Sequence, residues 1–386
     1  MSRAFRLGAL AALAFAVQAG GAQAQSVLSS RGLGYPIEPV DARARGLGGV
    51  ALGLPEATFS LVNPAGPVGL ATAAISVTFQ PDQYDATAGT QATSGSTARF
   101  PAVQAVFQPR PRFTLMAGYG SFLDQNYRAT RSDSITLSTG RVAVEERFRS
   151  QGAIARFRGG IGYRAGPRFA VGLAVDAFTG AVRDTSQRFV EGLNPAVSAT
   201  TVTYTGTGIS AGMRWMPVEA LSFAAAVSGG GKLNASPDDS TVAEKDYSLP
   251  VTLDVGASAR VSGNLLLAGS GRWAGWGAAD DDITNRGGAR DALNLAAGLE
   301  YDGFTLLGQT LPLRLGARMA RLPFRWDGAD SAFPDERAIT AGIGARLGRG
   351  AAMLDAAVER GSRGGDAAGF EEPFWRGSLS VTLFAR

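Results

Sequence analysis

Short stretches in which apolar residues alternate with small or polar residues recur along most of this chain. Between residues 374 and 385, for example, Trp375 and Val381 fall on one parity, whereas Arg376 and Ser380 fall on the other. Successive side chains of a β-strand point to opposite faces, so each stretch is expected to form a strand with one apolar face and one small or polar face. Helical periodicity is scarce by comparison. The sequence therefore predicts an all-β protein.

The polar parity of these stretches repeatedly carries charge, which separates the pattern from that of a soluble sandwich. These charged residues are Arg156, Arg158, Arg214, Arg260, Arg272, Arg314, Arg318, Arg346, Arg376, Asp176, Asp254, Glu300, Asp355 and Glu359. About fourteen strands are expected, each close to the roughly 9–11 residues that a tilted strand needs to cross hydrocarbon. They are 72–80, 99–108, 112–121, 151–164, 168–178, 202–216, 221–230, 249–260, 265–274, 291–301, 311–320, 337–347, 351–360 and 374–385.

The connections between the expected strands alternate in length. The long connections are 81–98, 122–150, 179–201, 231–248, 275–290, 321–336 and 361–373. Most of the others are tight turns marked by Pro, Gly or Asn, such as 109–111 and 348–350. Short turns at one end and long loops at the other are typical of outer-membrane barrels. Because hydrocarbon tolerates no free sheet edge, we expect a closed antiparallel transmembrane β-barrel of about 14 strands over residues 71–386, with the short turns facing the periplasm.

The beginning of the chain has the three parts of a secretory signal. Two arginines precede an apolar run at 7–17, and Ala22-Gln23-Ala24 places small residues at the positions that a signal peptidase reads. The run is too short to span a bilayer, and no later stretch reaches the roughly 18 apolar residues of a transmembrane helix. We expect a signal peptide at 1–24 and an exported protein of the outer membrane, with an N-terminal membrane anchor as the alternative.

Residues 25–70 lack strand-length alternation and are apolar and rich in glycine. A barrel of about fourteen strands is wide enough to need filling, so we expect this segment inside it as a plug, or hatch. The hatch or gate candidates are Gly46, Gly48, Gly49, Asn63, Pro64, Ala65 and Gly66. The glycines permit positive φ and close backbone approach, and the residue before a proline is pushed out of helical geometry. A gate and a simple tight turn into the first strand remain open as alternatives.

Charged side chains inside a barrel must be paired or hydrated, because burying an unpaired charge is costly. The candidates for a charge network in the lumen are Arg156, Arg158, Arg214, Arg314, Arg318, Asp254, Glu300 and Asp355. We expect the arginines to pair with the plug backbone and with plug acids such as Asp41 and Glu56.

Three motifs of the plug segment carry a family resemblance. Arg43-Ala44-Arg45-Gly46-Leu47-Gly48-Gly49, Glu56-Ala57-Thr58 and Asn63-Pro64-Ala65-Gly66 resemble the hatch signature of the outer-membrane long-chain fatty acid and hydrocarbon transporters, the FadL-like family. The family includes PorV-like relatives that serve type IX secretion. Its barrel has fourteen strands, like the one expected here. Leu47 stands where the family usually has Met, and the usual acidic pair before the third motif is reduced to Pro55-Glu56.

The resemblance implies passive uptake of fatty-acid-like or hydrocarbon-like molecules. A ligand would enter a groove supplied by 122–150, pass a pocket beside the hatch and leave through a lateral opening in the wall. The alternative is a protein-interaction barrel that serves protein secretion or surface attachment, and a diffusion porin is a third reading. Expected partners are a hydrophobic ligand, outer-membrane lipid or lipopolysaccharide, the barrel assembly machinery and, in the alternative reading, secreted proteins.

The composition excludes several classes of function. The chain has no His and no Cys, so it lacks His-activated nucleophiles, His or thiolate metal ligands and disulfides. We expect no enzyme activity, no metal and no cofactor. A net charge of only +4 argues against nucleic-acid binding. The run 229–232 lacks the full phosphate-loop pattern and is expected in an external loop, and Asp280-Asp281-Asp282 is expected to be a solvated loop.

Overall fold

The computed structural model describes residues 26–137, 140–190, 192–283, 288–306, 308–326 and 332–385. The signal peptide expected at 1–24 lies outside the described residues. Within them, no helix is both long enough and apolar enough to cross a membrane.

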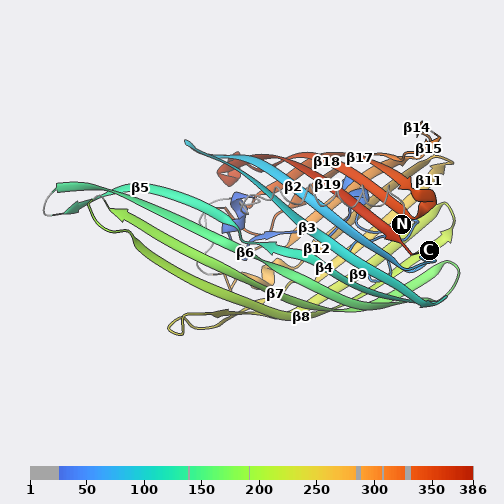
Figure 1. Ribbon diagram of the computed structural model, residues 1–386, viewed down its shortest axis with the longest axis horizontal. Helices are drawn as coiled ribbons and strands as arrows, with labels where there is room; N and C mark the ends of the chain where they lie inside the picture. Colours follow the sequence, from blue (N-terminus) through green and yellow to red (C-terminus); the bar gives the residue numbers. More distant parts are fainter. Residues whose placement is uncertain are drawn as a thin grey trace.

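Fourteen long antiparallel strands form a closed barrel (Figure 1), which confirms the predicted fold class. They are β2 Ala74–Ala88, β3 Gln91–Arg110, β4 Phe113–Asp124, β6 Gly140–Arg164, β7 Phe169–Val190, β8 Ala196–Val218, β9 Leu221–Pro237, β11 Thr252–Ser262, β12 Leu265–Ala274, β13 Ala292–Tyr301, β16 Leu313–Arg321, β17 Asp335–Leu347, β18 Ala352–Gly365 and β19 Phe370–Phe384. Strand β19 pairs with β2, and β9 pairs with β11, so the sheet closes on itself.

The remaining elements of the described residues are short, apart from β5. The additional strands are β1 Tyr35–Pro36, β5 Tyr127–Leu137, β10 Lys245–Ser248, β14 Thr305–Leu306 and β15 Gln309–Thr310. The helices are α2 Ala42–Gly46 and the 3₁₀ turns η1 Val27–Ser30, η2 Trp276–Ala279, η3 Gly348–Gly350 and η4 Asp366–Ala368.

The alternation seen in the sequence separates the two faces of the wall. In β19, Arg376 and Ser380 are buried, whereas Trp375 is 52% exposed. Leu173 and Val175 of β7 are likewise 63% and 64% exposed on the outer face. An apolar outer band around a polar interior suits a barrel that sits in hydrocarbon.

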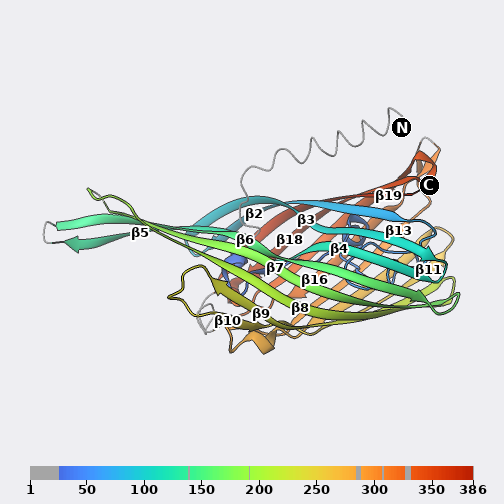
Figure 2. The same cartoon turned by 60° about the horizontal axis from the view of Figure 1, so that its bottom comes forward.

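The prediction of long irregular loops was wrong at 81–98, 122–150, 179–201 and 231–248. These segments continue the strands as hairpins, because their alternating Thr, Ser, Val and Arg residues keep the β pattern beyond the hydrocarbon. Strands β5 to β8 form a sheet that extends well past the rest of the barrel (Figures 1 and 2). The glycines of 229–232 also lie in β9 and not in a loop.

One seam in the wall is incomplete. The pairing of β3 with β4 ends at Ala102 and Gly120. Beyond that point β3 pairs with β2, β5 pairs with β6, and among the described residues β3 and β5 do not pair with each other. The edge of β4 there pairs with the two residues of β1. On its other edge, β4 pairs with β6, and a register shift in that pairing leaves Phe122 without a ladder partner.

The described residues that precede β2 run within the barrel, drawn in blue in Figures 1 and 2. Tyr35 and Pro36 pair with Asp124 and Leu123 of β4. From Val40 to Leu54 every residue is buried. Farther along the segment, Phe59 packs against Phe384, the last residue of β19, with ring centroids 6.3 Å apart.

Candidate functional site

Helix α2 sits at the centre of the interior segment, and the local sequence explains its ends. The Asp41 side chain caps it by accepting a hydrogen bond from the Ala44 N–H at 2.8 Å, so Asp41 serves as a cap, where we expected it to pair with a lumen arginine. The helix stops at Gly46. Gly48 and Gly49 follow with φ of +79° and +93°, a conformation that favours glycine.

The wall approaches this glycine turn at backbone distance. A Cβ on Gly48 would lie 2.5 Å from the Ala317 carbonyl oxygen, and one on Gly316 of β16 would lie 2.2 Å from the Gly48 nitrogen. Thr340 of β17 joins the two surfaces, because its Oγ1 donates to the Gly46 carbonyl at 3.0 Å and accepts from the Gly48 N–H at 2.9 Å. The wall glycines opposite the turn are Gly298, Gly316 and Gly342. That glycines of the turn would lie opposite glycines of the wall was not predicted from the sequence.

The segment from Asn63 to Gly66 forms a tight turn against β7 and β8. Asn63 Oδ1 accepts from the Ala65 N–H at 2.8 Å, and Asn63 Nδ2 donates to the Met213 carbonyl at 3.0 Å. A Cβ on Gly172 would lie 2.4 Å from the Pro64 carbonyl carbon. Of the predicted gate candidates, these form one unit of structure, and Gly46, Gly48 and Gly49 form another.

Arginines of β6 and β8 hold the interior segment through its backbone. Arg158 pairs with Asp176 at 2.7 Å and donates to the Leu61 carbonyl at 2.7 Å. Arg156 donates to the same carbonyl at 2.8 Å, and Arg214 donates to the Val68 carbonyl at 2.5 Å. These contacts depend on the path of the interior backbone and not on its side chains.

A second group of charges surrounds Glu300 of β13. Arg43 of α2 approaches Glu300 Oε1 at 2.7 Å, and Arg314 of β16 approaches Oε2 at 2.6 Å. Arg314 also pairs with Asp355 at 2.7 Å, and Arg43 pairs with Glu56 at 2.8 Å. Each of the five charged residues in this group has an opposite charge beside it, as burial requires.

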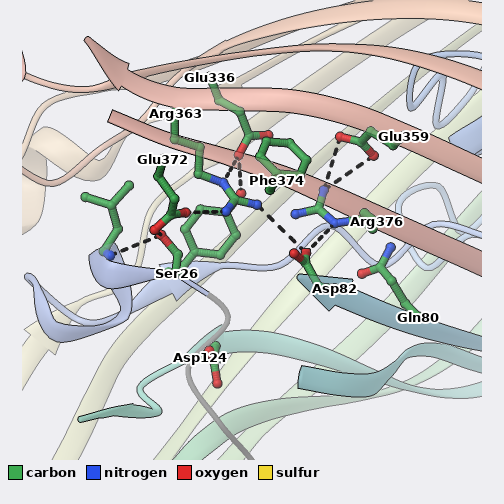
Figure 3. A network of polar contacts seen from close by, with 12 residues as sticks. Ser26, Gln80, Asp82, Asp124, Glu336, Glu359, Arg363, Glu372, Phe374 and Arg376 are labelled. Atoms are coloured by element: carbon green, nitrogen blue, oxygen red, sulfur yellow. Dashed lines mark hydrogen bonds and ion pairs between the residues drawn. The ribbon is translucent and has the colours of Figure 1, made fainter. Parts of the chain in front are cut away.

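A third and larger network lies farther along β16 to β19, shown in Figure 3. Arg363 pairs with Glu336 at 2.5 Å and with Glu372, and its guanidinium stacks 3.9 Å from the Phe374 ring centroid. The Glu372 carboxylate also accepts a 2.7 Å hydrogen bond from the Val27 N–H, at the start of the described segment.

The same network continues through Arg376 and Arg318. Arg376 pairs with Asp82 at 2.8 Å and with Glu359 at 3.3 Å, and Arg318 pairs with Glu359 at 2.6 Å and with Glu336. Removing one partner of such a buried pair costs about 3–5 kcal/mol, because the other charge is left uncompensated. The network therefore fixes residues 26–45 against this part of the wall.

Several members of this network were missed from the sequence. Asp82, Glu336, Arg363 and Glu372 fell in segments taken as loops, although each lies in a strand that continues beyond the hydrocarbon. The alternation of inward and outward positions along each strand could have identified them. In β18, Glu359 and Arg363 share the buried face, four residues apart.

A cavity of about 120 Å³ lies between the interior segment and β11 to β16. Its lining includes the apolar residues Ile37, Phe122 and Trp276 and the charged residues Glu38, Arg45, Arg272, Arg318, Arg321, Glu336 and Arg376. A second cavity of about 60 Å³ shares Ile37, Phe122 and Arg272 with it. Asp254, the remaining predicted charge, lines the second cavity and pairs with Arg272 at 2.6 Å.

Two of the residues that line the cavity, Phe122 and Trp276, belong to a larger cluster of aromatic rings. Phe122 lies 4.7 Å from Phe178 and 6.1 Å from Trp276, measured between ring centroids, and Trp276 lies 5.3 Å from Phe324. These rings come from β4, β7, η2 and the segment after β16. Their packing gives the two cavities one continuous aromatic surface.

The Glu38 carboxyl, which the interior segment contributes to the cavity lining, is held in its ionised state. Burial alone would raise the pKa of the Glu38 carboxyl, but Arg45 and Arg318 outweigh burial and hold it below its ordinary value. Burial raises the pKa of the Tyr35 hydroxyl, which donates to Glu336 at 2.5 Å. Among the described residues, no group of three or more acidic side chains is arranged to hold a metal ion.

A comparison with protein families identifies the group to which this barrel belongs. The family model described as BamG matches residues 1–227, more than half of the chain. The chain belongs to the BamG family. Among curated proteins, no sequence matches this BamG-family chain.

Solved structures resemble the BamG-family chain in fold at low sequence identity. A FadL homologue of Pseudomonas aeruginosa is 13% identical, with a TM-score of 0.63 over 91% of this chain and 99% of that chain. The monoaromatic hydrocarbon channel CymD is 14% identical, with a TM-score of 0.59 over 91% and 98%. The Pseudomonas putida toluene transporter TodX is 16% identical, with a TM-score of 0.57 over 90% and 99%. The fold of the resemblance stated from the sequence is thus confirmed.

Proposed function

We propose that this protein is an outer-membrane channel through which hydrophobic small molecules with a polar end pass without energy input. The observation that carries the proposal is the cavity beside Ile37, which is lined by both aromatic and charged side chains. An apolar chain would lie against Phe122 and Trp276, and a carboxylate or other polar end would face Arg272. The FadL-like fold supports the proposal, since among the similar structures CymD is a monoaromatic hydrocarbon channel and TodX is a toluene transporter.

In this proposal residues 25–70 act as the hatch, and a ligand leaves the cavity through the seam between β3 and β4. Phe122 links the two places, because it lines the cavity and directly follows Ser121, whose side chain makes a contact across the seam. Above the last β3–β4 pair, the Ser121 hydroxyl donates to the Phe100 carbonyl at 3.3 Å. The wall can open here at the cost of few backbone hydrogen bonds.

Native mass spectrometry of the barrel, extracted from outer membranes in mild detergent, tests for the ligand. We expect a bound mass of a few hundred daltons that detergent exchange removes. Hexadecanoic acid added back should bind more tightly than hexadecane, because only the acid has a polar end for Arg272. A barrel that takes up neither molecule and retains none from the membrane would contradict the proposal.

The aromatic surface is tested by Phe122→Ala, with Phe113→Ala as a matched control. Both residues lie in β4, but Phe113 is 37% exposed on the outer face and Phe122 lines the cavity. Losing one aromatic contact of about 1.4 kcal/mol corresponds to a tenfold loss of affinity. We expect that loss for Phe122→Ala only. If both variants bound hexadecanoic acid with equal affinity, the ligand would not bind in this cavity.

The seam is tested by a reversible lock, which is simple in a chain without cysteine. The pair Phe100→Cys and Ser121→Cys closes the seam on oxidation, whereas Val103→Cys and Tyr119→Cys joins two residues that are already paired. In vesicles containing the protein, oxidation should stop uptake of hexadecanoic acid for the first pair only, and a reductant should restore it. Uptake that survives the first lock would refute a lateral exit at this position.

A protein-interaction barrel is the second candidate function, and two observations favour it. The chain belongs to the BamG family, whose name suggests a link to barrel assembly, and within the described residues β5 has a ladder with β6 on one edge and no residue-by-residue pairing on its other edge. A free strand edge can bind an extended polypeptide. The same native mass spectrum separates the two functions. A retained polypeptide without a small ligand would favour this second candidate.

A further inference from the structure

Three arginines project from the outer face of the sheet that extends beyond the barrel. The β6–β7 ladder runs without a register shift, so Arg149 shares a face with Phe157 and Arg183 shares a face with Leu173. Arg128 of β5 pairs directly with Arg149 in the ladder and therefore lies on the same face. All three arginines are exposed. They lie on the outer face of the sheet, the same face that is turned toward hydrocarbon where these strands cross the membrane.

The register brings these positive charges close together. Arg128 lies directly opposite Arg149, and Arg183 lies on the diagonal of Arg149, since Arg149 pairs with Thr185. Direct cross-strand neighbours have Cβ atoms about 4.5–5.5 Å apart, and diagonal neighbours lie within about 7–8 Å. Like charges directly opposite each other destabilise a sheet. An anion bound between them would remove that cost.

Within the described chain, these three side chains have no ion pair and no hydrogen bond. The neighbouring carboxylates are engaged elsewhere. Glu145, two positions beyond Arg147 on the same face, pairs with Arg147. Asp238 accepts the Thr201 N–H at 2.8 Å, beside the Arg183 position. By contrast, the arginines on the opposite face of the same sheet are paired, Arg131 with Asp133 and Arg188 with Glu146.

The arginines stand at the depth of lipid headgroups. The aromatic edge of the apolar band lies at Phe169 and Trp215, which pair in the ladder. Arg183 follows Phe169 by fourteen residues along β7, or about 46 Å of strand at about 3.3 Å per residue. With a tilt of about 40–45°, that is about 33–35 Å along the membrane normal, some 8–10 Å beyond an apolar band of about 25 Å.

An open groove of about 1030 Å³ lies below them on the outer wall. It crosses β4 and β6 to β9 and is lined mostly by small and apolar residues, among them Gly159, Ala177 and Gly229, with Arg158 and Asp176 also in its lining. A Cβ placed on Gly159 would meet no atom within 4 Å. Ala177 lies six residues below Arg183, about 14 Å along the normal, so the groove begins within the hydrocarbon of the outer leaflet.

We infer that this face binds an outer-leaflet lipid with a phosphate monoester headgroup. The phosphate sits among Arg128, Arg149 and Arg183, and an acyl chain fills the groove at Gly159. Arginine suits this role, because its planar fork of donors matches phosphate oxygens in pairs. The site requires that the barrel span the outer membrane but not the ligand proposed above, so the two proposals can fail separately.

The test compares two charge-matched double variants. Arg149→Gln with Arg183→Gln removes two arginines from the outer face, and Arg131→Gln with Arg188→Gln removes two from the opposite face of the same sheet. Binding of bis-phosphorylated lipid A to the detergent-solubilised barrel is measured by native mass spectrometry. At about 1 kcal/mol for each arginine near a membrane surface, the first variant should bind roughly tenfold or more weakly and the second within twofold of wild type. An equal loss of lipid A binding in both variants would overturn the proposed site.

Two further experiments test the contributions of the headgroup and of the acyl chain separately. Lipid A without phosphates should bind all of these barrels equally weakly, and inorganic phosphate at the same concentration should not displace the phosphorylated lipid. Gly159→Leu should weaken binding by filling the groove, whereas Ala105→Leu, on the outer face of β3, should not. Displacement by free phosphate, an unchanged affinity for Gly159→Leu, or an acidic polypeptide retained on the arginines in place of lipid would each overturn the proposal. Heat-modified migration on gels verifies that every variant is a folded barrel.

Discussion

Substituting Gly48 by Ala tests whether the interior segment is packed against the wall at backbone distance. At this residue φ is +79°, and the added Cβ would lie 2.5 Å from the Ala317 carbonyl oxygen and 2.8 Å from the Ala297 carbonyl oxygen. Gly49 is a control at the next position. Its φ is +93°, but the atom nearest to an added Cβ, in Glu38, is 3.6 Å away. The two variants share the backbone strain and differ in the clash.

The magnitude follows from these two terms. A positive φ costs a residue with a Cβ about 1–2 kcal/mol, which is the full cost expected for Gly49→Ala. Overpacking against rigid surroundings adds about 1–3 kcal/mol for Gly48→Ala, since β13 and β16 cannot move apart without breaking their ladder. Local opening of residues 42–49 should therefore be easier in Gly48→Ala by about 1–3 kcal/mol, or roughly 5- to 150-fold in the opening equilibrium.

Hydrogen–deuterium exchange of the peptide that contains 42–49 measures this difference in the intact barrel. The protected groups include the Gly49 N–H, bonded to the Ala44 carbonyl at 2.8 Å, and the Gly48 N–H, bonded to Thr340. Exchange should accelerate much more in Gly48→Ala than in Gly49→Ala, with little change in the barrel strands. Equal acceleration in both variants would refute the close approach and, with it, the packing of α2 against the wall.

Three further perturbations test other contacts of the interior segment. Gly212→Ala would place a Cβ 2.0 Å from Asn63 Oδ1 and should destabilise that turn by about 1–3 kcal/mol, measured by exchange at 61–66. Tyr35→Phe removes a 2.5 Å hydrogen bond to a buried carboxylate and should cost about 1.5–3 kcal/mol, measured by exchange at 35–37. Because Arg45 holds the pKa of Glu38 below its ordinary 4.5, the stability that ionised Glu38 supplies is present above pH 4.5 and is lost as pH falls below it. The difference in melting temperature between wild type and Glu38→Gln should therefore shrink in acid.

The closed barrel could be predicted because its physics is local and repetitive. Each of the fourteen expected strands overlaps an observed one, since every strand must place an apolar residue outward at every second position. The strand ends could not be predicted from the membrane argument. That argument counts only the residues needed to cross hydrocarbon, and β6 extends to 25 residues because hydrogen bonding between strands also continues in water.

The same limit explains which parts of the site were found. Arg314, Arg318, Glu300 and Asp355 lie within the crossing segments, and their parity identified them as inward. The partners Arg363 and Glu372 lie beyond those segments and were assigned to a loop. The pairing of Glu300 with Arg43 joins residues 257 positions apart in the sequence, and no local pattern specifies it.

The contacts divide the interior segment into two parts that depend on different residues. From Leu61 to Val68 the segment is held mainly by the wall, whose Arg158 and Arg214 donate to its carbonyl groups and whose glycines admit its backbone. From Ser26 to Glu56 the segment supplies many of its own charges, and Arg43 and Arg45 pair with carboxylates. Substitutions in the first part should therefore be tolerated unless they clash, whereas charge loss in the second part leaves buried wall carboxylates uncompensated. The cavity at Ile37 lies beside the second part. Arg45 and Glu38 both line this cavity and form an ion pair at 3.0 Å, so the second part of the segment also supplies opposite charges to the cavity lining.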